Sequence, residues 1–191
     1  MRLTVFATLL AYGVIARSEP VAYALDPAHT YPSFEADHMG ISVWRGKFNQ
    51  TSGTLTLDRS AGAGEVSAVV DLASVDFGHE EMNANARGAE FFDIARFPQA
   101  QYRGRLVDFV AGAPTRVVGE LELHGVKAPL TLEIRQFRCI PHPLLERELC
   151  GADAIGQFER DDFGLDAGRD YGFDMTVTLR IQMEAIAEAA P

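Results

Sequence analysis

Hydrophobic and polar residues alternate along residues 117–134 in two runs separated by a short break. In both runs, 117–123 and 130–134, nearly every second side chain is Val, Leu or Ile. Successive side chains of a strand point to opposite faces, so each run has one apolar face and one polar face. The break includes Gly125 and Pro129, which favour turns. The pattern predicts an antiparallel hairpin with its turn at 124–129.

The same alternation recurs through most of the chain. It is clearest at 174–184, where every second residue from Met175 to Met183 is apolar. Further runs with strand character lie at residues 23–30, 33–37, 45–58, 66–72, 101–109 and 155–160. Gly53 predicts a bend or bulge inside one of them. About eight strands separated by turn signals predict an all-β fold, either an antiparallel barrel or a sandwich.

Residues 80–92 break the alternation, because their Ala, Met and Glu content favours an α-helix. Glu80 and Glu81 suit the positive end of the helix dipole, whereas Gly88 weakens the helix. A second, shorter helical turn is predicted at 38–42. No repeat or linker divides the chain, so its 191 residues are predicted to contain one domain.

Composition and charge exclude several classes of function. Hydrophobic residues make up 47% of the chain, which argues against a disordered protein. The formal net charge of −10 argues against binding to a nucleic-acid backbone, which requires a basic face. It argues equally against docking on anionic lipid headgroups by charge alone. We therefore expect no nucleic-acid partner.

Residues 1–16 differ from the rest of the chain, because Arg2 precedes an apolar run that ends in small residues. This arrangement is typical of a secretory signal peptide, cleaved after Ala16 or further on after Ala24. An uncleaved anchor is the alternative, although the run is shorter than the ~20 residues of a typical span. No other apolar run is long enough, so residues 17–191 are predicted to form an exported domain without a stable membrane span.

The chain has two cysteines, Cys139 and Cys150, and neither belongs to a Cys-x-x-Cys motif. Export into an oxidising compartment favours a disulfide between them. The chain-entropy account gives ~3 kcal/mol for closing a loop of this size. Two separate buried thiols are the alternative.

Residues with the chemistry of metal ligands or catalysts are scattered. Glu35 and Asp37 share one face of a predicted strand, His38 lies on the other, and no His pair has metal-site spacing. Solvated polar side chains are therefore expected at Asp26, His29, Glu35, Asp37 and His38. His79 precedes two glutamates and is predicted to flank a helix. The chain lacks a Gly-x-Ser-x-Gly elbow and a phosphate-binding loop, so we predict no enzyme, no metal site and no cofactor.

Four stretches of the chain carry short motifs in a characteristic order. They are Tyr-Ala-Leu-Asp-Pro-Ala-His-Thr (23–30) with Phe-Glu-Ala-Asp-His-Met-Gly-Ile-Ser (34–42) and Gly-Lys-Phe-Asn (46–49), Ala-Glu-Phe-Phe-Asp-Ile-Ala-Arg-Phe-Pro (89–98), Gly-Glu-Leu-Glu-Leu-His-Gly-Val-Lys-Ala-Pro (119–129), and Arg-Asp-Asp-Phe-Gly (160–164). In this order and spacing they resemble the YceI-like family of secreted lipid-binding proteins.

The resemblance implies a lipocalin-like antiparallel β-barrel of about eight strands, with one or two short helices and an extended internal cavity. In such relatives the cavity holds a long apolar tail, polyisoprenoid or quinone-like, or a fatty-acid derivative. The resemblance also implies a periplasmic location and brings no catalytic residues. The chain departs from the family pattern at 83–88 and at Trp44-Arg45, so the contacts with a ligand head group are expected to differ.

An apolar tail requires a tube of apolar walls more than it requires polar contacts. Aromatic side chains predicted to line or cover the tube are Phe34, Trp44, Phe48, Phe91, Phe92 and Phe97. Aliphatic side chains that point inward by strand period are Leu121, Leu123, Leu132, Val177 and Leu179. Both groups could instead pack a solid interior. Arg160 could hold an anionic head group by bidentate hydrogen bonds, with a strand-end ion pair to Asp161 or Asp162 as the alternative.

These patterns together predict a periplasmic carrier that sequesters a long-chain isoprenoid, quinone or related lipid inside its barrel. The segment at Phe91 and Phe92 is predicted to act as a gate. Two other classes stay open: a filled barrel with a structural or stress-response role, and a hydrolase acting on a lipid. A continuous cavity of several hundred Å³ would argue against the filled barrel. A homodimer also stays open.

Overall fold

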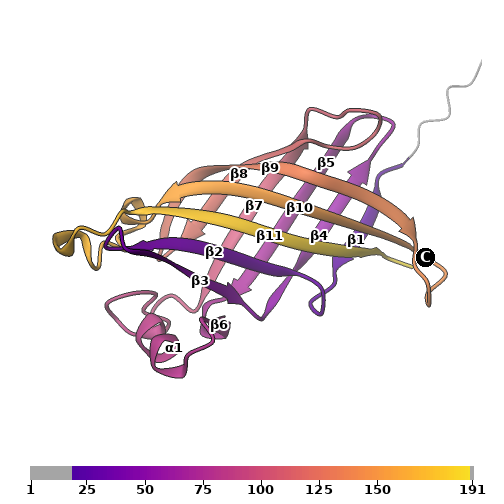
Figure 1. Ribbon diagram of the computed structural model, residues 1–191. Helices are drawn as coiled ribbons and strands as arrows, with labels where there is room; N and C mark the ends of the chain where they lie inside the picture. Colours follow the sequence, from indigo (N-terminus) through magenta and orange to yellow (C-terminus); the bar gives the residue numbers. More distant parts are fainter. Residues whose placement is uncertain (1–18, 190–191) are drawn as a thin grey trace, which may run out of the picture.

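The computed structural model describes residues 19–189, most of which lie in β-strands (Figure 1). The strands are β1 (Val21–Leu25), β2 (Tyr31–His38), β3 (Ser42–Phe48), β4 (Thr51–Asp58), β5 (Ala63–Asp71), β6 (Val75–Asp76), β7 (Gln99–Val107), β8 (Arg116–Leu123), β9 (Val126–Pro141), β10 (Glu148–Glu159) and β11 (Thr176–Ala187). The helical elements are the α-helix α1 (Glu80–Arg87) and the 3₁₀ helices η1 (Leu72–Ser74), η2 (Arg160–Phe163) and η3 (Arg169–Tyr171).

The strands form a closed antiparallel barrel. Around the wall they follow the order β1-β4-β5-β7-β8-β9-β10-β11, and β1 then pairs with β11, which closes a ring of eight strands. Closure removes the exposed sheet edges that would otherwise pair with other chains. The lipocalin-like barrel is therefore confirmed, and the sandwich alternative is wrong.

Two positions in the ring are held by interrupted strands. β1 and β2 both run antiparallel to β11, with Leu25 opposite Ala185 and Tyr31 opposite Gln182. β4 pairs with β1 and β3 pairs with β2, so the second position is split in the same way. The split falls at residues 49–50 because the backbone N–H of Asn49 turns away to donate to the Ser74 carbonyl at 3.1 Å. The run predicted at 45–58 is therefore two strands rather than one.

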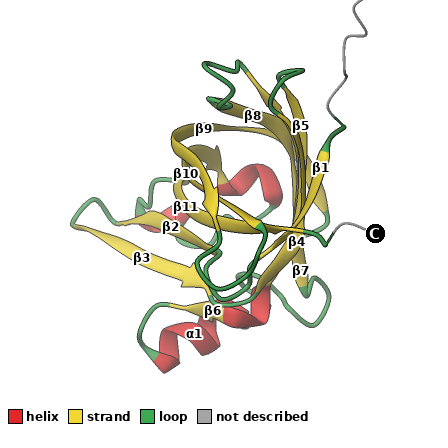
Figure 2. Ribbon diagram, turned by 90° about the vertical axis from the view of Figure 1, so that its right-hand side faces the viewer, coloured by secondary structure: helices red, strands yellow, loops and turns green. Residues whose placement is uncertain are grey.

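A short helix covers the part of the wall beside β3. Within the described chain, the outer edge of β3 pairs only with the two-residue strand β6, at Lys47 and Phe48. Figures 1 and 2 show α1 next to β6, outside the main run of strands. The buried side chain of Asn83 ties the helix to this position, since its Oδ1 accepts a hydrogen bond from the Phe77 N–H at 2.7 Å.

The hairpin predicted at 117–134 is present, but its turn is shorter than expected. Only His124 and Gly125 separate β8 from β9, and both have positive φ angles, 53° and 77°. Two-residue turns of this kind match the twist of the paired strands. Residues 126–129 are therefore strand, and Pro129 sits inside the ladder opposite Glu120.

Two helical predictions need correction. The helix predicted at 80–92 ends at Arg87, because the Gly88 N–H bonds back to the Asn85 carbonyl at 2.9 Å and the chain then turns. The helical turn predicted at 38–42 is a hairpin turn between β2 and β3, where Met39 and Gly40 have positive φ. Neither segment has the length that stabilises an isolated helix.

The predicted signal peptide, residues 1–16, lies outside the described residues. Among the described residues, no helix has the length and apolar character needed to cross a membrane. The one-domain boundary at 17–191 stays a prediction.

Candidate ligand cavity

The barrel encloses an apolar cavity of about 400 Å³. Inward-facing side chains of the barrel strands form its wall, and Met82, Asn85 and Ala86 of α1 close the gap beside β3. The volume falls within the range of small-molecule binding pockets. The barrel interior is therefore hollow at the end that α1 covers.

Eleven of the side chains predicted to contact a ligand lie on this wall. They are Phe34, Trp44, Phe48, Phe91, Phe92, Leu121, Leu123, Leu132, Arg160, Val177 and Leu179. Most are buried or half-buried, whereas Phe91 is 37% exposed and stands where the cavity meets solvent. Their placement suits the predicted role, and contact with a ligand stays a prediction.

Phe97 is the exception, because it lies away from the cavity wall. Its ring packs against the imidazole of His124 with centroids 4.3 Å apart, and the Arg96 guanidinium covers it at 4.9 Å. The cause is the turn after α1, where Asp93 has a positive φ of 43° and accepts the Phe97 N–H. This turn carries the ring to the β8–β9 hairpin, where it supports the outside of the barrel mouth.

Arg160 is held by backbone carbonyls rather than by a carboxylate. Its Nη1 donates to the Leu165 carbonyl at 2.6 Å, and its Nη2 donates to the Ala167 carbonyl at 2.7 Å. Partial burial lowers the pKa of its guanidinium. Among the described residues Arg160 forms no ion pair with Asp161 or Asp162, so that alternative is wrong. Asp161 pairs with Arg169 instead. Arg160 therefore positions the loop after η2 at the cavity wall.

Glycines on neighbouring strands keep large rings flat against the wall. Phe34 lies directly opposite Gly46, where a Cβ would sit 2.5 Å from the end of the ring. Tyr102 lies over Gly119 in the same way, with 2.8 Å from such a Cβ to the ring. The Tyr102 hydroxyl donates to the Leu130 carbonyl at 3.0 Å, which fixes the ring along the strands. These rings therefore leave the centre of the barrel open.

Aromatic stacking shapes the mouth of the cavity. The imidazole of His38 stacks on Trp44 with centroids 4.1 Å apart and meets the edge of Phe173 at 5.2 Å. Phe92 contacts Phe48 edge to face at 5.6 Å, which joins the segment after α1 to β3. Rings from three segments distant in sequence therefore converge at one entrance.

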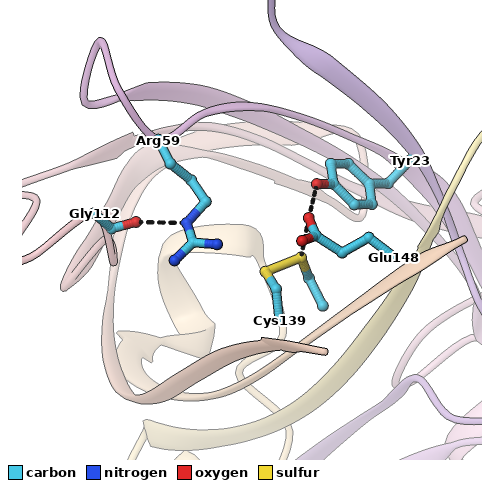
Figure 3. Close-up of a disulfide and its surroundings, with 6 residues drawn as sticks. Tyr23, Arg59, Gly112, Cys139 and Glu148 are labelled. Atoms are coloured by element: carbon cyan, nitrogen blue, oxygen red, sulfur yellow. Dashed lines mark hydrogen bonds between the residues drawn. A yellow bond between two sulfur atoms is a disulfide. The ribbon is translucent and has the colours of Figure 1, made fainter. Parts of the chain in front are cut away.

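At the opposite end of the barrel, buried apolar side chains pack around a disulfide, which Figure 3 shows with its surroundings. Cys139 and Cys150 form the predicted disulfide across β9 and β10, so the alternative of separate thiols is wrong. Beside it, the Tyr23 hydroxyl donates to Glu148 at 2.6 Å, and burial is the main cause that raises the pKa of Tyr23. Figure 3 also shows Arg59, whose Nε donates to the Gly112 carbonyl at 3.2 Å. The disulfide and the Tyr23 ring therefore belong to the packed apolar cluster at this end.

The polar residues near the N-terminus of the barrel have separate partners. Asp26 bonds to His29 at 2.7 Å, which lowers the pKa of Asp26 and raises that of His29. Hydrogen bonds from Arg45 and Arg180 lower the pKa of Glu35 on the outer wall. The Asp37 carboxylate accepts the backbone N–H of Gly40 and of Asp174. In this part of the described chain these groups serve the turns and the outer wall.

The fold and its interior define a closed antiparallel barrel with an apolar cavity behind a short helix. The chain belongs to the YceI-like family, because residues 23–185 match the YceI-like domain. It is 33% identical over 141 residues to the UPF0312 protein VPA0850 of Vibrio parahaemolyticus, covering 70% of this chain and 73% of that protein. It is 32% identical over 138 residues to Protein YceI of Salmonella arizonae, covering 72% and 71%.

Solved structures show the same fold at lower identity. BcnA of Burkholderia cenocepacia matches with a TM-score of 0.67 at 20% identity, over 84% of this chain and 98% of that one. A polyisoprenoid binding domain from Saccharophagus degradans, implicated in plant cell wall breakdown, matches with a TM-score of 0.63 at 22% identity. That match covers 88% of this chain and 99% of the other.

Proposed function

We propose that the protein is a carrier that holds a long-chain isoprenoid, quinone or related lipid inside its barrel and keeps the tail out of water. The observation that carries this proposal is the apolar cavity of about 400 Å³. Each methylene removed from water contributes ~0.8 kcal/mol, so a tail in such a cavity binds tightly without many polar contacts. The polyisoprenoid binding domain with the same fold supports the choice of ligand class.

The charged groups on the cavity wall favour carriage over turnover. Arg160 donates to the carbonyls of Leu165 and Ala167, and Asp37 accepts backbone N–H groups. General acid–base catalysis requires a group free to exchange a proton with the substrate. Both wall residues hold backbone groups in place, which supports a binding protein over a lipid hydrolase.

The cavity also argues against the other alternative, a filled barrel with a purely structural role. An interior lined by apolar side chains and left vacant forfeits packing contacts that a solid core would gain. A bound tail restores those contacts. The signal peptide predicted at residues 1–16 favours a periplasmic site of action, where such a carrier would keep a lipid dispersed between membranes.

Organic extraction of the purified, exported protein followed by mass spectrometry tests this function. We expect a long-chain lipid with an apolar tail in near-stoichiometric amount. N-terminal sequencing of the same sample tests export, with cleavage expected after Ala16 or Ala24. Protein that carries no lipid and binds none when lipid is supplied would contradict the proposal.

A further inference from the structure

Three side chains in register across β9, β10 and β11 mark the inner end of the cavity. Phe137 lies opposite Ala152, which lies opposite Met183, and all three line the cavity. The next row of inward-facing residues contains the disulfide, with Cys139 opposite Cys150, and neither cysteine lines the cavity. On these three strands the cavity therefore ends between the two rows. We call Phe137, Ala152 and Met183 the floor row.

A β-bulge brings Phe137 into the floor row. Ile134 faces the cavity, and strand alternation alone would place Gln136 there next. The register between β9 and β10 shifts after Ile134, which leaves Arg135 without an opposite residue and reverses the alternation. Phe137 therefore faces inward, and Gln136 lies exposed on the outer wall. The bulge thus places a large apolar ring, rather than an amide, at the inner end of the cavity.

The interior behind the floor row is closed by packed side chains. Phe137 and Met183 pack against the buried cluster around the disulfide, which includes Tyr23 and Leu57. Tyr23 and Leu57 are 1% and 2% exposed, and neither lines the cavity. A packed interior does not admit additional methylene groups without displacing its own side chains. A ligand that enters at the mouth beside Phe91 therefore cannot pass the floor row.

We propose that the floor row sets the longest apolar tail that the cavity accepts. This inference rests on the proposed function and concerns the length of the tail, whatever its chemical class. The tail enters with its apolar end first, because the polar head group is more stable in water at the mouth. Binding strengthens with each carbon removed from water until the end of the tail meets the floor row. Carbons beyond that length stay at the mouth in contact with water and add no affinity.

Two members of the floor row should control the limit in opposite directions. Phe137 has the largest side chain of the row, and a phenyl ring is similar in size to an isoprene unit. Removing the ring would deepen the cavity toward the disulfide. Ala152 has the smallest side chain of the row, so a larger residue there would fill the deepest part of the cavity and shorten it.

The binding experiment uses Trp44, the single tryptophan of the chain, which lies on the cavity wall. Its emission reports titration of delipidated protein with a series of prenols that lengthen by one isoprene unit at a time. For wild type we expect affinity to rise roughly tenfold or more with each unit and then to level off at a limiting length. Phe137→Ala should move the limiting length up by about one isoprene unit, and Ala152→Leu should move it down.

Leu132→Ala is the matched control, because it enlarges the same wall on β9 away from the floor row. It should change the affinity for all prenols by a similar factor and leave the limiting length where wild type has it. The far-ultraviolet circular dichroism spectrum and the melting temperature of each variant report whether the barrel is folded. Phe137→Leu, which loses less packing, replaces Phe137→Ala if that variant does not fold.

The outcomes separate the floor row from the function. One limiting length shared by wild type, the folded Phe137 variant and Ala152→Leu would overturn the proposal and leave lipid carriage intact. Affinity that keeps rising through the whole series in wild type would do the same, as would an equal shift of the limiting length in Leu132→Ala. Wild-type protein that binds none of the prenols would contradict the proposed function itself.

Discussion

The two ends of the barrel interior are built from similar apolar strands, yet one end is filled and the other is hollow. At the filled end Tyr23, Leu57 and Cys150 are at most 2% exposed and pack around the disulfide. At the hollow end Phe34 and Tyr102 lie flat on glycines of adjacent strands and leave about 400 Å³ open. Glycines beneath the two large rings therefore help to keep the hollow end open in this barrel.

The largest expected effect concerns the entrance to the hollow end. The double substitution Phe91→Asp and Phe92→Asp should abolish lipid retention, because carboxylates at the threshold resist burial under a lipid tail. The barrel should stay folded, since neither residue belongs to a strand and Phe91 is 37% exposed. Lipid content after extraction and the far-ultraviolet circular dichroism spectrum measure the two effects.

The matched control for the Phe91 and Phe92 substitutions lies at the other end of the barrel. Leu144 and Leu145, in the β9–β10 connection, are 87% and 38% exposed. Replacing both with Asp should leave lipid content unchanged. A Phe91 and Phe92 double variant that retains as much lipid as this control would contradict the gate.

Truncation of one leucine at each end compares the two interiors directly. Leu57→Ala at the filled end should cost about 4 kcal/mol of unfolding free energy, because it creates a new cavity in packed surroundings. Leu132→Ala at the hollow end should cost about 2 kcal/mol, because its side chain already borders empty space and has fewer contacts to lose. Denaturant unfolding of both variants without ligand measures the difference. Equal losses of unfolding free energy would argue against one packed end and one hollow end.

Removing the disulfide should affect the filled end alone. The bridge closes a loop with a sequence separation of 11 residues, for which the chain-entropy account gives about 3 kcal/mol. We expect Cys139→Ala with Cys150→Ala to lower the melting temperature while lipid affinity stays within a factor of about two of wild type, below 0.5 kcal/mol. A large loss of affinity would show that the two ends are coupled.

The smallest expected effect comes from the Asp26–His29 pair in the connection between β1 and β2. The pKa of His29 is raised, so its contribution to stability is present at low pH and is lost as pH rises through that raised value. The pKa of Asp26 is lowered, so its contribution is lost as pH falls through that lowered value. His29→Gln should therefore lower the melting temperature slightly between these two values and not outside them.

Melting curves across pH measure the pair, with His79→Gln at the start of α1 as control. The His79 side chain makes no capping hydrogen bond, so that variant should follow wild type. Identical pH profiles for wild type and His29→Gln would contradict a stabilising role for the pair.

The strand periodicity predicted most of the fold because alternation reports directly which side chains face inward. The same logic placed Leu121, Leu132 and Val177 on the cavity wall. Phe97 could not be placed in this way, because one residue of positive φ, Asp93, turns the chain outward after the helix. Short turns depend on the backbone geometry of single residues, and hydrophobic periodicity does not predict that geometry.

Other features of the site depend on contacts between distant strands. In the sequence, the glycines under Phe34 and Tyr102 are only small residues within alternating runs. Such glycines indicate that another group approaches closely, but the sequence does not say which side chain that is. Arg160 resembles a head-group ligand in sequence, but its carbonyl partners come from the loop that follows η2.

A crystal of the delipidated protein under xenon pressure tests the hollow interior most directly. Xenon enters dry apolar cavities and is visible by its scattering. We expect xenon sites among Phe34, Leu121 and Leu132 at the hollow end, and none around Leu57 and the disulfide. An interior without xenon, with the cavity occupied by the protein's own side chains, would contradict the account.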